Sequence, residues 1–390
     1  MMARTCLAWT RLTIWCEQVR VLMLKELKQL VRDRALFAYT VFIFTLDIVL
    51  AAGASSIELH RAPLAVAQAQ PSAAGRELIG RFRQPHFEVR RQIDDTREAS
   101  VLLDRGEVRA VLTLPEHFQD DLALGRQTEV QLLVDTAQAN QGFLVASYAA
   151  RISAEFGADW AQRTLLREGV DPSRLPELRA EVRYAYNASL NEVWFNTMSE
   201  WLTMLTIAAI VLPAAALVRE RERGTIEQLL VAPLEPLQVV LSKVLAMVLV
   251  MLAGSAVAVL GVMHAGYGVP LRASMGLFFT VVALFTMACA GVGIVASGFA
   301  RNSGQMSLIV MLVVVPMVML SGTWNMVESM PGWLQLLTEF SPLRHFIVLA
   351  YGILIRGAGL DILWPSLLKM LVLGTALFAI GVLRFRRQFR

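Results

Sequence analysis

The sequence predicts a mainly α-helical, polytopic membrane protein that carries a small α/β domain outside the membrane. Hydrophobic residues make up 56% of the 390 residues and charged residues only 17%, and the mean hydropathy is +0.53. A soluble chain of this length would carry more charge. The apolar residues are gathered into six runs of membrane-spanning length, and one long polar region separates the first run from the second.

A cytoplasmic leader, residues 1–34, contains a basic amphipathic helix over Gln18–Arg34. Its apolar side chains share one face, and Lys25, Lys28 and Arg32 share another. Such a helix lies in the headgroup layer of a membrane surface. There it can act as an anchor and also as a gate or a docking element.

The first apolar run, Ala35–Ala52, would be about 27 Å long as a helix. A cleaved signal peptide is the alternative, because residues 52–55 (Ala-Gly-Ala-Ser) resemble a small-residue cleavage site. Signal peptides have short positive leaders, whereas this run follows a long amphipathic segment. A transmembrane helix over 35–54 is therefore the favoured interpretation.

Five further runs lie within residues 197–390. Four of them contain no Asp, Glu, Lys or Arg, and the last is interrupted near one end by Lys369, whose long side chain can extend to the interface. These runs are Trp201–Val218, Val244–Met263, Ala273–Ala300, Ser303–Val327 and Leu363–Leu383. Together with the first run they predict six transmembrane helices.

Two carboxylates lie close to the apolar interior. Asp47 interrupts the first run, and Glu200 stands at the start of the second. A carboxylate within a membrane span is costly and often functional, so both are candidates to line a translocation pathway. For Asp47 the alternatives are pairing with a neighbouring helix or a position nearer the outer surface.

The distribution of Lys and Arg predicts the orientation. Basic residues are concentrated in the leader, the loop between the second and third runs, the loop between the fourth and fifth, and the C-terminal tail. Six spans place all four segments on one side, which is then the cytoplasmic side, with both termini. The region 55–196 must lie on the other side, and long translocated domains escape this rule.

A short charged segment, 219–236, joins the second and third runs. Arg219 to Arg223 form a dense run of charged residues, and Gly224 follows. Thr225 and Gln228 have the spacing of a helix-capping box, and prolines close the segment from Pro233 onward. We interpret the charged run as a loop. For the capped residues from Thr225 to Pro233 we predict a short, rigid helix that protrudes from the cytoplasmic face.

The outer region, 55–196, alternates strand-like and helix-like pieces, which predicts an α/β domain. The expected strands are Leu64–Ala69, Phe87–Gln92, Val108–Leu114 and Val130–Val134. The expected helices are Gly75–Phe82, Thr96–Arg105, Glu116–Leu124 and Gln138–Leu166.

Between the fifth and sixth runs, residues 328–355 form short apolar pieces broken by prolines and polar residues. Phe346–Ile355 is too short to cross a membrane. We therefore predict re-entrant helices that dip into the outer leaflet and return, with their backbone buried in protein.

Signals for chemistry within this chain are absent from the sequence. It has no Gly-x-x-x-x-Gly-Lys-Ser/Thr loop, no nucleophile elbow and no His-Glu-x-x-His motif. The three cysteines, Cys6, Cys16 and Cys289, show no metal-ligand spacing, and the five histidines are scattered. We expect no catalytic residue, no metal site and no cofactor bound by this chain.

The chain resembles a known family over nearly its whole length, and four stretches carry the resemblance. They are Lys25–Arg34 (Lys-Glu-Leu-Lys-Gln-Leu-Val-Arg-Asp-Arg), Arg221–Leu234 (Arg-Glu-Arg-Gly-Thr-Ile-Glu-Gln-Leu-Leu-Val-Ala-Pro-Leu), Met330–Gln335 and Ser341–Arg344. The chain resembles the permease subunit of a bacterial ABC-2-type exporter, in the drug-exporter branch with a large periplasmic domain. The Glu-Arg-Gly-Thr-x-Glu-Gln-Leu stretch is the most specific part of this resemblance.

The resemblance implies the partners. A second permease, either the same chain or a sister chain, and cytoplasmic ABC ATPase subunits that hold ATP and Mg would complete the transporter in the bacterial inner membrane. A periplasmic membrane-fusion adaptor and an outer-membrane channel often join such systems, and no nucleic acid is implied.

The resemblance also implies site residues. The ATPase-coupling residues would be Arg221, Glu222, Arg223, Gly224, Thr225, Glu227, Gln228 and Pro233. The connecting helix beside them would include Lys25, Glu26, Lys28 and Arg32. The pathway role considered for Asp47 does not transfer from the family.

Export of hydrophobic or amphiphilic compounds, powered by a separate ATPase, is the function that these features favour. One alternative is an ATP-driven mechanical transducer acting on a periplasmic partner, and another is an exporter of a lipid or polysaccharide. A secondary transporter is disfavoured because the sequence lacks an internal repeat and clustered intramembrane charges.

Overall fold

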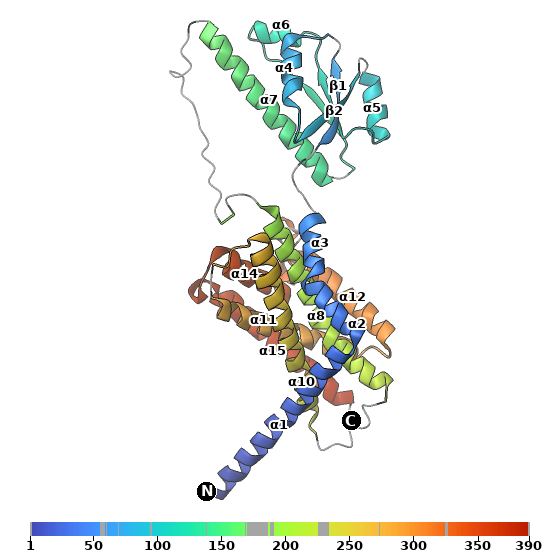
Figure 1. Cartoon of the computed structure of the whole chain (residues 1–390), viewed down its shortest axis with the longest axis vertical. Helices are drawn as coiled ribbons and strands as arrows, with labels where there is room; N and C mark the ends of the chain where they lie inside the picture. The colour runs from blue at the N-terminus through green and yellow to red at the C-terminus, as the bar shows by residue number, and fades with distance from the viewer. Residues whose placement is uncertain are drawn as a thin grey trace. The chain divides into compact units, whose positions relative to one another are not determined.

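The structure is a computed structural model in which the chain forms two compact units (Figure 1). It describes residues 2–54, 59, 61–68, 70–93, 96–137, 139–167, 169, 186–187, 191–224, 234–272, 274–323 and 327–388. One unit, here the helical unit, comprises Met1–Ser55 and Tyr184–Arg390, and the other, the α/β unit, comprises Ser56–Arg183.

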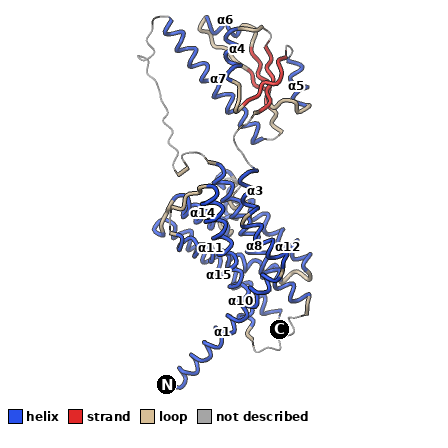
Figure 2. The backbone as a smooth tube through the Cα atoms, in the orientation of Figure 1, coloured by secondary structure: helices blue, strands red, loops and turns tan. Residues whose placement is uncertain are grey.

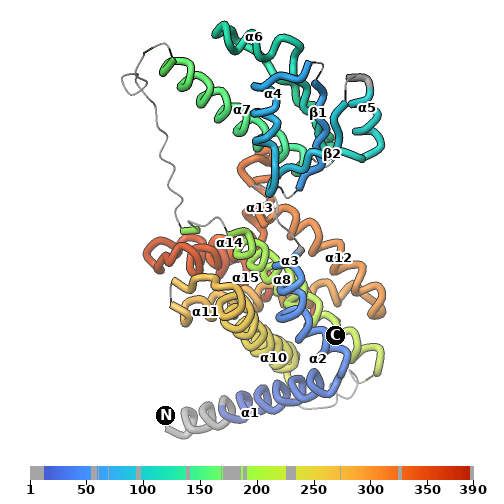
Figure 3. Tube along the Cα trace, turned by 45° about the horizontal axis from the view of Figure 1, so that its top comes forward, coloured from blue at the N-terminus to red at the C-terminus, as the bar shows by residue number. Residues whose placement is uncertain are grey.

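The helical unit consists of long apolar helices and, between the last two long ones, a series of short helices. In chain order these are α1 Met2–Arg32, α2 Arg34–Phe44, α3 Leu46–Ala54, α8 Glu192–Glu222, α10 Pro236–Ala256, the π-helix η2 Val257–Gly266, α11 Met275–Ser297, α12 Ser303–Met319, the 3-10 turn η3 Val327–Ser329, α13 Gly332–Thr338, α14 Pro342–Tyr351, the π-helix η4 Gly352–Arg356 and α15 Leu360–Gln388. Figure 3 shows α1 leading into α2 and lying beside the start of α10.

Among the described residues, five helices are long and apolar enough to cross a membrane. They are Arg34–Gly53, Glu192–Glu222, Pro236–Gly266, Met275–Ser297 and Leu360–Arg386. Five of the predicted runs are thereby confirmed as helices of spanning length, while the six-span count and the orientation stay predictions.

The predicted extent of the fifth run, Ser303–Val327, is wrong. Helix α12 has 17 residues and ends at Met319. Gly322 then adopts a φ of 96°, which turns the chain out of the helix, and the hydroxyl groups of Ser321 and Thr323 bond to each other at 2.9 Å. Apolar composition alone did not reveal this stop.

The first run is also interrupted. Asp33 separates α1 from α2 and caps α2, because its Oδ1 accepts a hydrogen bond from Leu36 N at 3.2 Å. Thr45 breaks the run between α2 and α3, and its hydroxyl donates back to Val41 O at 2.6 Å. The transmembrane helix predicted over 35–54 is therefore divided at Thr45, although the span Arg34–Gly53 is long enough to cross a membrane.

Helix α8 lies at the centre of the helical unit. Its most apolar window is 72% buried within the chain, against 22% for α15. Trp201 on α8 is in contact with Phe278 and Phe346, with ring centroids 5.5 and 5.8 Å apart, and donates to Ser255 Oγ on α10 at 3.3 Å. This aromatic core joins α8 to α10, α11 and α14.

Close packing around α11 depends on glycine. A Cβ added at Gly291 would come within 2.6 Å of Phe378 N and 2.8 Å of Leu377 O on α15, both backbone atoms. Gly293 likewise faces the backbone of Ile210 on α8. Small residues at such positions let membrane helices approach closely, so α11 is held between α15 and α8.

The α/β unit has a four-stranded sheet in the order β2-β1-β3-β4 (Figure 2). Strands β1 (Ala62–Gln68), β2 (Phe87–Ile93) and β3 (Ala110–Leu114) are parallel, and β4 (Gln131–Val134) is antiparallel to β3. All four predicted strands are confirmed to within two residues.

Helices cover both faces of this sheet. On one face α4 (Ala73–Arg81), α6 (Phe118–Ala123) and α7 (Ala139–Arg167) pack on alternate strand residues such as Leu64. On the other face α5 (Thr96–Asp104) packs on the intervening residues such as Ala65. Because successive strand side chains point to opposite faces, the buried strand β1 is apolar at both sets of positions.

Overpacking of the α11–α15 contact tests this description. We expect Gly291→Ala to lower the free energy of unfolding by about 1–3 kcal/mol, since the added methyl group meets backbone that cannot rotate away. Unfolding of the purified protein in detergent micelles would measure the change. Gly261→Ala is the matched control, because no atom lies within 4 Å of a Cβ added there. Equal stability of the two variants would contradict the close contact.

Candidate functional site

The charged residues Arg219–Glu222, which we predicted to lie in a loop, form the last turn of α8. Arg219, Arg221 and Glu222 are helical, and so is Glu220, which is buried. The interpretation of these residues as a loop is wrong, because helical hydrogen bonding continues to the end of α8, where Arg223 N donates to Arg219 O at 3.0 Å. Gly224 ends the helix with a φ of 68°, the left-handed conformation common after a helix.

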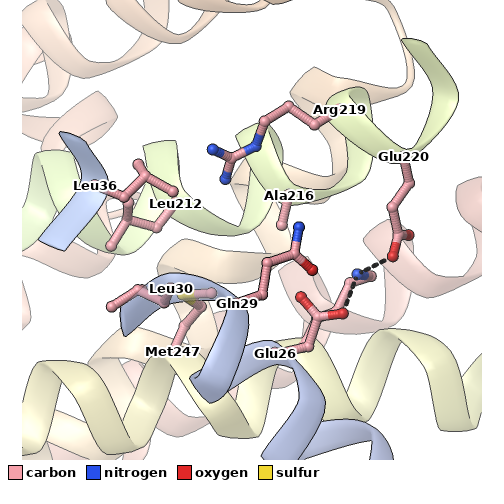
Figure 4. Close-up of a pocket in the computed structure, with 10 residues that line it drawn as sticks. Glu26, Gln29, Leu30, Leu36, Leu212, Ala216, Arg219, Glu220 and Met247 are labelled. Atoms are coloured by element: carbon pink, nitrogen blue, oxygen red, sulfur yellow. Dashed lines mark hydrogen bonds and ion pairs between the residues drawn. The ribbon is translucent and has the colours of Figure 1, made fainter. Parts of the chain in front are cut away.

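A buried lysine joins three helices at this end of the unit. Lys243 Nζ on α10 donates to Glu26 Oε1 on α1 and to Glu220 Oε1 on α8, each at 2.7 Å (Figure 4). Lys243 is 3% exposed, Glu26 6% and Glu220 7%. Lys25 Nζ, at the exposed edge, lies 3.8 Å from Glu26 Oε1 and 3.7 Å from Glu220 Oε1. We call these four residues the charge cluster.

The charge cluster is electrically balanced, with two carboxylates and two ammonium groups. Charges removed from water are stable only when each is paired, and removal of one partner leaves the other buried and uncompensated. The loss is typically about 3–5 kcal/mol. These bonds therefore hold α1, α8 and α10 in one arrangement.

A small cavity adjoins the charge cluster and is lined by Arg219, Gln29 and Glu220, among others (Figure 4). Its volume is about 20 Å³, which is room for one water molecule. Arg219 Nη1 lies 3.4 Å from Asp33 Oδ2, at the junction of α1 and α2. The last turns of α8 are thus also tied to the start of the first apolar run.

The same turn of α8 binds two further helix ends. Arg221 Nη1 donates to Ala300 O, just after α11, at 2.9 Å. Both Glu222 carboxylate oxygens accept from Ser303, one from its N and one from its Oγ, each at 2.7 Å. Because unpaired N–H groups at a helix start attract an anion, Glu222 stabilises the start of α12 in addition to its N-cap residue, Asn302.

The other end of the 225–233 segment is anchored as well. Glu235 precedes α10, and its backbone N donates to Gln238 Oε1 at 2.7 Å. From α1, Trp15 Nε1 donates to Glu235 Oε2 at 3.3 Å, and Gln18 Oε1 accepts from Gln238 Nε2 at 2.7 Å. The helix ends on both sides of this segment are therefore fixed to α1.

The predicted site residues differ in where they lie. Glu26 and Lys25 enter the charge cluster, and Arg221 and Glu222 bind neighbouring helix ends, whereas Lys28 and Arg32 are exposed on α1 and Arg223 is exposed at the end of α8. Gly224 ends α8. The rest of the predicted coupling set, Thr225, Glu227, Gln228 and Pro233, lies outside the described residues.

Asp47 and Glu200, predicted separately, are brought together. The carboxyl group of Glu200 on α8 lies near that of Asp47 on α3, and Asp47 Oδ2 is buried without a hydrogen-bond partner. Among the described residues, no group of three or more His, Cys, Asp or Glu could hold a metal ion.

Lys243 and Glu220 were missed as site residues by reasoning from the sequence. A signal was available: Lys243 is a cation at the start of an apolar run, and Glu26 is an acid among the basic residues of the leader. Isolated charges of opposite sign in apolar helices often pair. The pairing of Lys243 with Glu26 could not be deduced from the sequence, because the two residues are 217 positions apart.

Comparisons with known proteins find the same family of transporters over most of the chain. The family of ABC-2 family transporter proteins matches residues 35–383. The inner membrane transport permease YhhJ of Escherichia coli (strain K12) is 35% identical over 365 residues, covering 93% of this chain and 96% of the relative. The probable multidrug ABC transporter permease YbhR of the same organism is 28% identical over 368 residues, covering 94% and 98%. The probable multidrug ABC transporter permease YbhS is 23% identical over 367 residues, covering 91% of each.

Removal of the buried lysine tests the charge cluster. We expect Lys243→Gln to lower the free energy of unfolding by about 3–5 kcal/mol, because Glu26 and Glu220 lose their shared buried partner. Unfolding of the protein in detergent micelles measures the loss. The matched control is Lys25→Gln, which removes a half-exposed cation near the same carboxylates and should cost less than about 1 kcal/mol. A loss for Lys243→Gln as small as that of the control would refute the buried ion pairs.

Proposed function

The chain belongs to the ABC-2 family of transporter proteins, and from this premise we propose that it is the permease subunit of an ATP-driven exporter. Its substrates are hydrophobic or amphiphilic compounds of the multidrug type, moved out of the cytoplasm or the inner membrane. The full-length similarity to permeases with multidrug names supports this substrate class. The protein lies in the bacterial inner membrane with both termini in the cytoplasm.

The charge cluster is the observation that carries the mechanism. It joins α8 to α1 and α10 through Glu220 and Lys243, which lie on either side of the 225–233 segment in the sequence. The last turn of α8 also binds Ala300 after α11 and Ser303 at the start of α12. Separating buried, paired charges costs several kcal/mol, so these helix ends move together. A push on the 225–233 segment therefore displaces the whole bundle rather than one loop.

The source of that push is a separate subunit. The chain has no phosphate-binding loop, so ATP and Mg are held by cytoplasmic ABC ATPase subunits. These subunits contact the 225–233 segment and α1, and a second permease, identical or a sister chain, completes the pathway. A periplasmic adaptor and an outer-membrane channel extend it across the cell envelope.

A charge reversal in the coupling segment tests this mechanism. We expect an ATPase subunit to copurify with the wild-type chain, and Glu227→Arg to abolish substrate efflux without reducing the amount of protein in the membrane. Efflux of a fluorescent hydrophobic dye from cells is the measurement. Glu98→Arg, a reversal at an exposed position of α5, is the control and should retain efflux. Full efflux by Glu227→Arg would remove the coupling role. If the wild-type system shows no substrate efflux but does show ATP-driven changes in the α/β unit, the result would favour the mechanical transducer.

Cysteine labelling tests the orientation separately. We expect Thr225→Cys, in a chain whose native cysteines are replaced by serine, to react with a membrane-impermeant maleimide only after the inner membrane is opened. Gln92→Cys, exposed on β2 of the α/β unit, should react once the outer membrane alone is permeable. The reverse pattern would place the coupling segment in the periplasm and overturn the proposed function.

A further inference from the structure

A second hollow lies at the opposite end of the helical unit from the charge cluster. It has a volume of about 280 Å³ and is formed by α14, the residues that follow α12, the 3-10 turn η3 and the π-helix η4. We call it the α14 hollow. The residues that decide its chemistry are Glu328, Arg344, Ile347, Val348, Tyr351 and Arg356.

The position of the hollow follows from the helix period. Leu343, Phe346 and Leu349 are buried, and the Phe346 ring stacks on Phe285 of α11 with centroids 4.0 Å apart. The hollow is lined by residues 344, 347, 348 and 351, which recur at the spacing of the other helix face. None of the described residues that line the hollow belongs to α11, α12 or α15.

Two guanidinium groups make the hollow positively charged. Arg356 is exposed, and no carboxylate in the described part of the chain lies within ion-pair distance of it. Arg344 Nε lies 3.4 Å from Glu339 Oε1, but that carboxylate is bound more closely by Lys369 Nζ, at 2.6 Å from Oε2. Glu328 is the one carboxylate that lines the hollow. The net charge of the residues that line the hollow is therefore +1, from two arginines and one glutamate.

The remaining wall is apolar. Ile347 and Val348 project from the middle of α14, and Val348 is 41% exposed. Arginine pairs matched to anionic oxygens bind phosphate well, and an adjoining apolar wall suits a hydrocarbon chain. We propose that the α14 hollow binds the phosphate headgroup of an amphiphile, with Arg344 and Arg356 on the phosphate and the chain against Ile347 and Val348.

The hollow is connected to the mechanism through α8. Tyr351, which lines it, bonds through its hydroxyl to Ser199 Oγ at 3.2 Å, and its ring lies 6.4 Å from that of Phe195. Ser199 and Arg219 are on one continuous helix, about 30 Å apart at the helical rise. This connection rests on the proposed function, whereas binding of the amphiphile does not.

Calorimetric titration of the purified full-length protein in neutral detergent tests the site. The probes are dioctanoyl phosphatidylglycerol, dioctanoyl phosphatidylcholine and glycerol 1-phosphate. We expect the anionic lipid to bind more tightly than the other two, because only it combines a net negative phosphate with a chain. Arg356→Gln, at an exposed position, should weaken its binding about tenfold without changing the melting temperature.

Arg344→Gln should show a similar loss, and Arg344→Lys should restore part of it because the charge returns. Arg384→Gln is the matched control, an exposed arginine of α15 beside Phe299, and should bind like the wild type. Equal binding of the two lipids, or binding unchanged in Arg356→Gln, would overturn the proposal. Glycerol 1-phosphate binding as tightly as the anionic lipid would make the site one for a water-borne phosphate and refute the amphiphile. The assay needs no ATPase, so its failure would leave the permease assignment untouched.

Discussion

A lysine buried between two carboxylates from different helices is the constraint on which the helical unit depends. Lys243 on α10 joins the neighbouring α8 to α1, which is distant in sequence, and its removal would leave two buried carboxylates without their shared cation. Apolar packing would let such helices slide, since lipid is as apolar as leucine. The ion pairs fix one register instead, and they do so next to the segment that the proposed mechanism pushes.

Helix α8 carries that constraint through the unit. Its last turn binds Asp33 at the start of the first apolar run, Ala300 after α11 and Ser303 at the start of α12, and its middle turns hold Trp201 in the aromatic core. The glycines of α11 bring that helix against the backbones of both α8 and α15. Ser199, whose hydroxyl bonds to Tyr351 of the α14 hollow, lies on the same helix as this last turn, with Pro213 between them. The α/β unit has its own apolar cores on both faces of its sheet.

Much of the fold could be predicted because its signals are local. The strands of the α/β unit follow from short strand-like pieces punctuated by Pro and Gly, and the spanning helices follow from long apolar runs. The errors occurred where a helix stops or continues for a reason outside composition. The hydroxyl groups of Ser321 and Thr323 and the turn at Gly322 end α12 early, whereas α8 continues through Arg219–Glu222 because its charges have partners on neighbouring helices.

By itself the sequence determined that the chain is a membrane protein and where most of its helices and strands lie, and it contains no Gly-x-x-x-x-Gly-Lys-Ser/Thr motif. It also marked the leader and the 219–236 segment as important. Only the tertiary structure decided which charges pair. Glu26 and Lys243 are 217 residues apart, Asp47 faces Glu200 from another helix, and Arg344 shares its hollow with Arg356. The physical reason is range: helix periodicity and capping act over a few residues, while a buried charge takes its partner from whichever helix packs beside it.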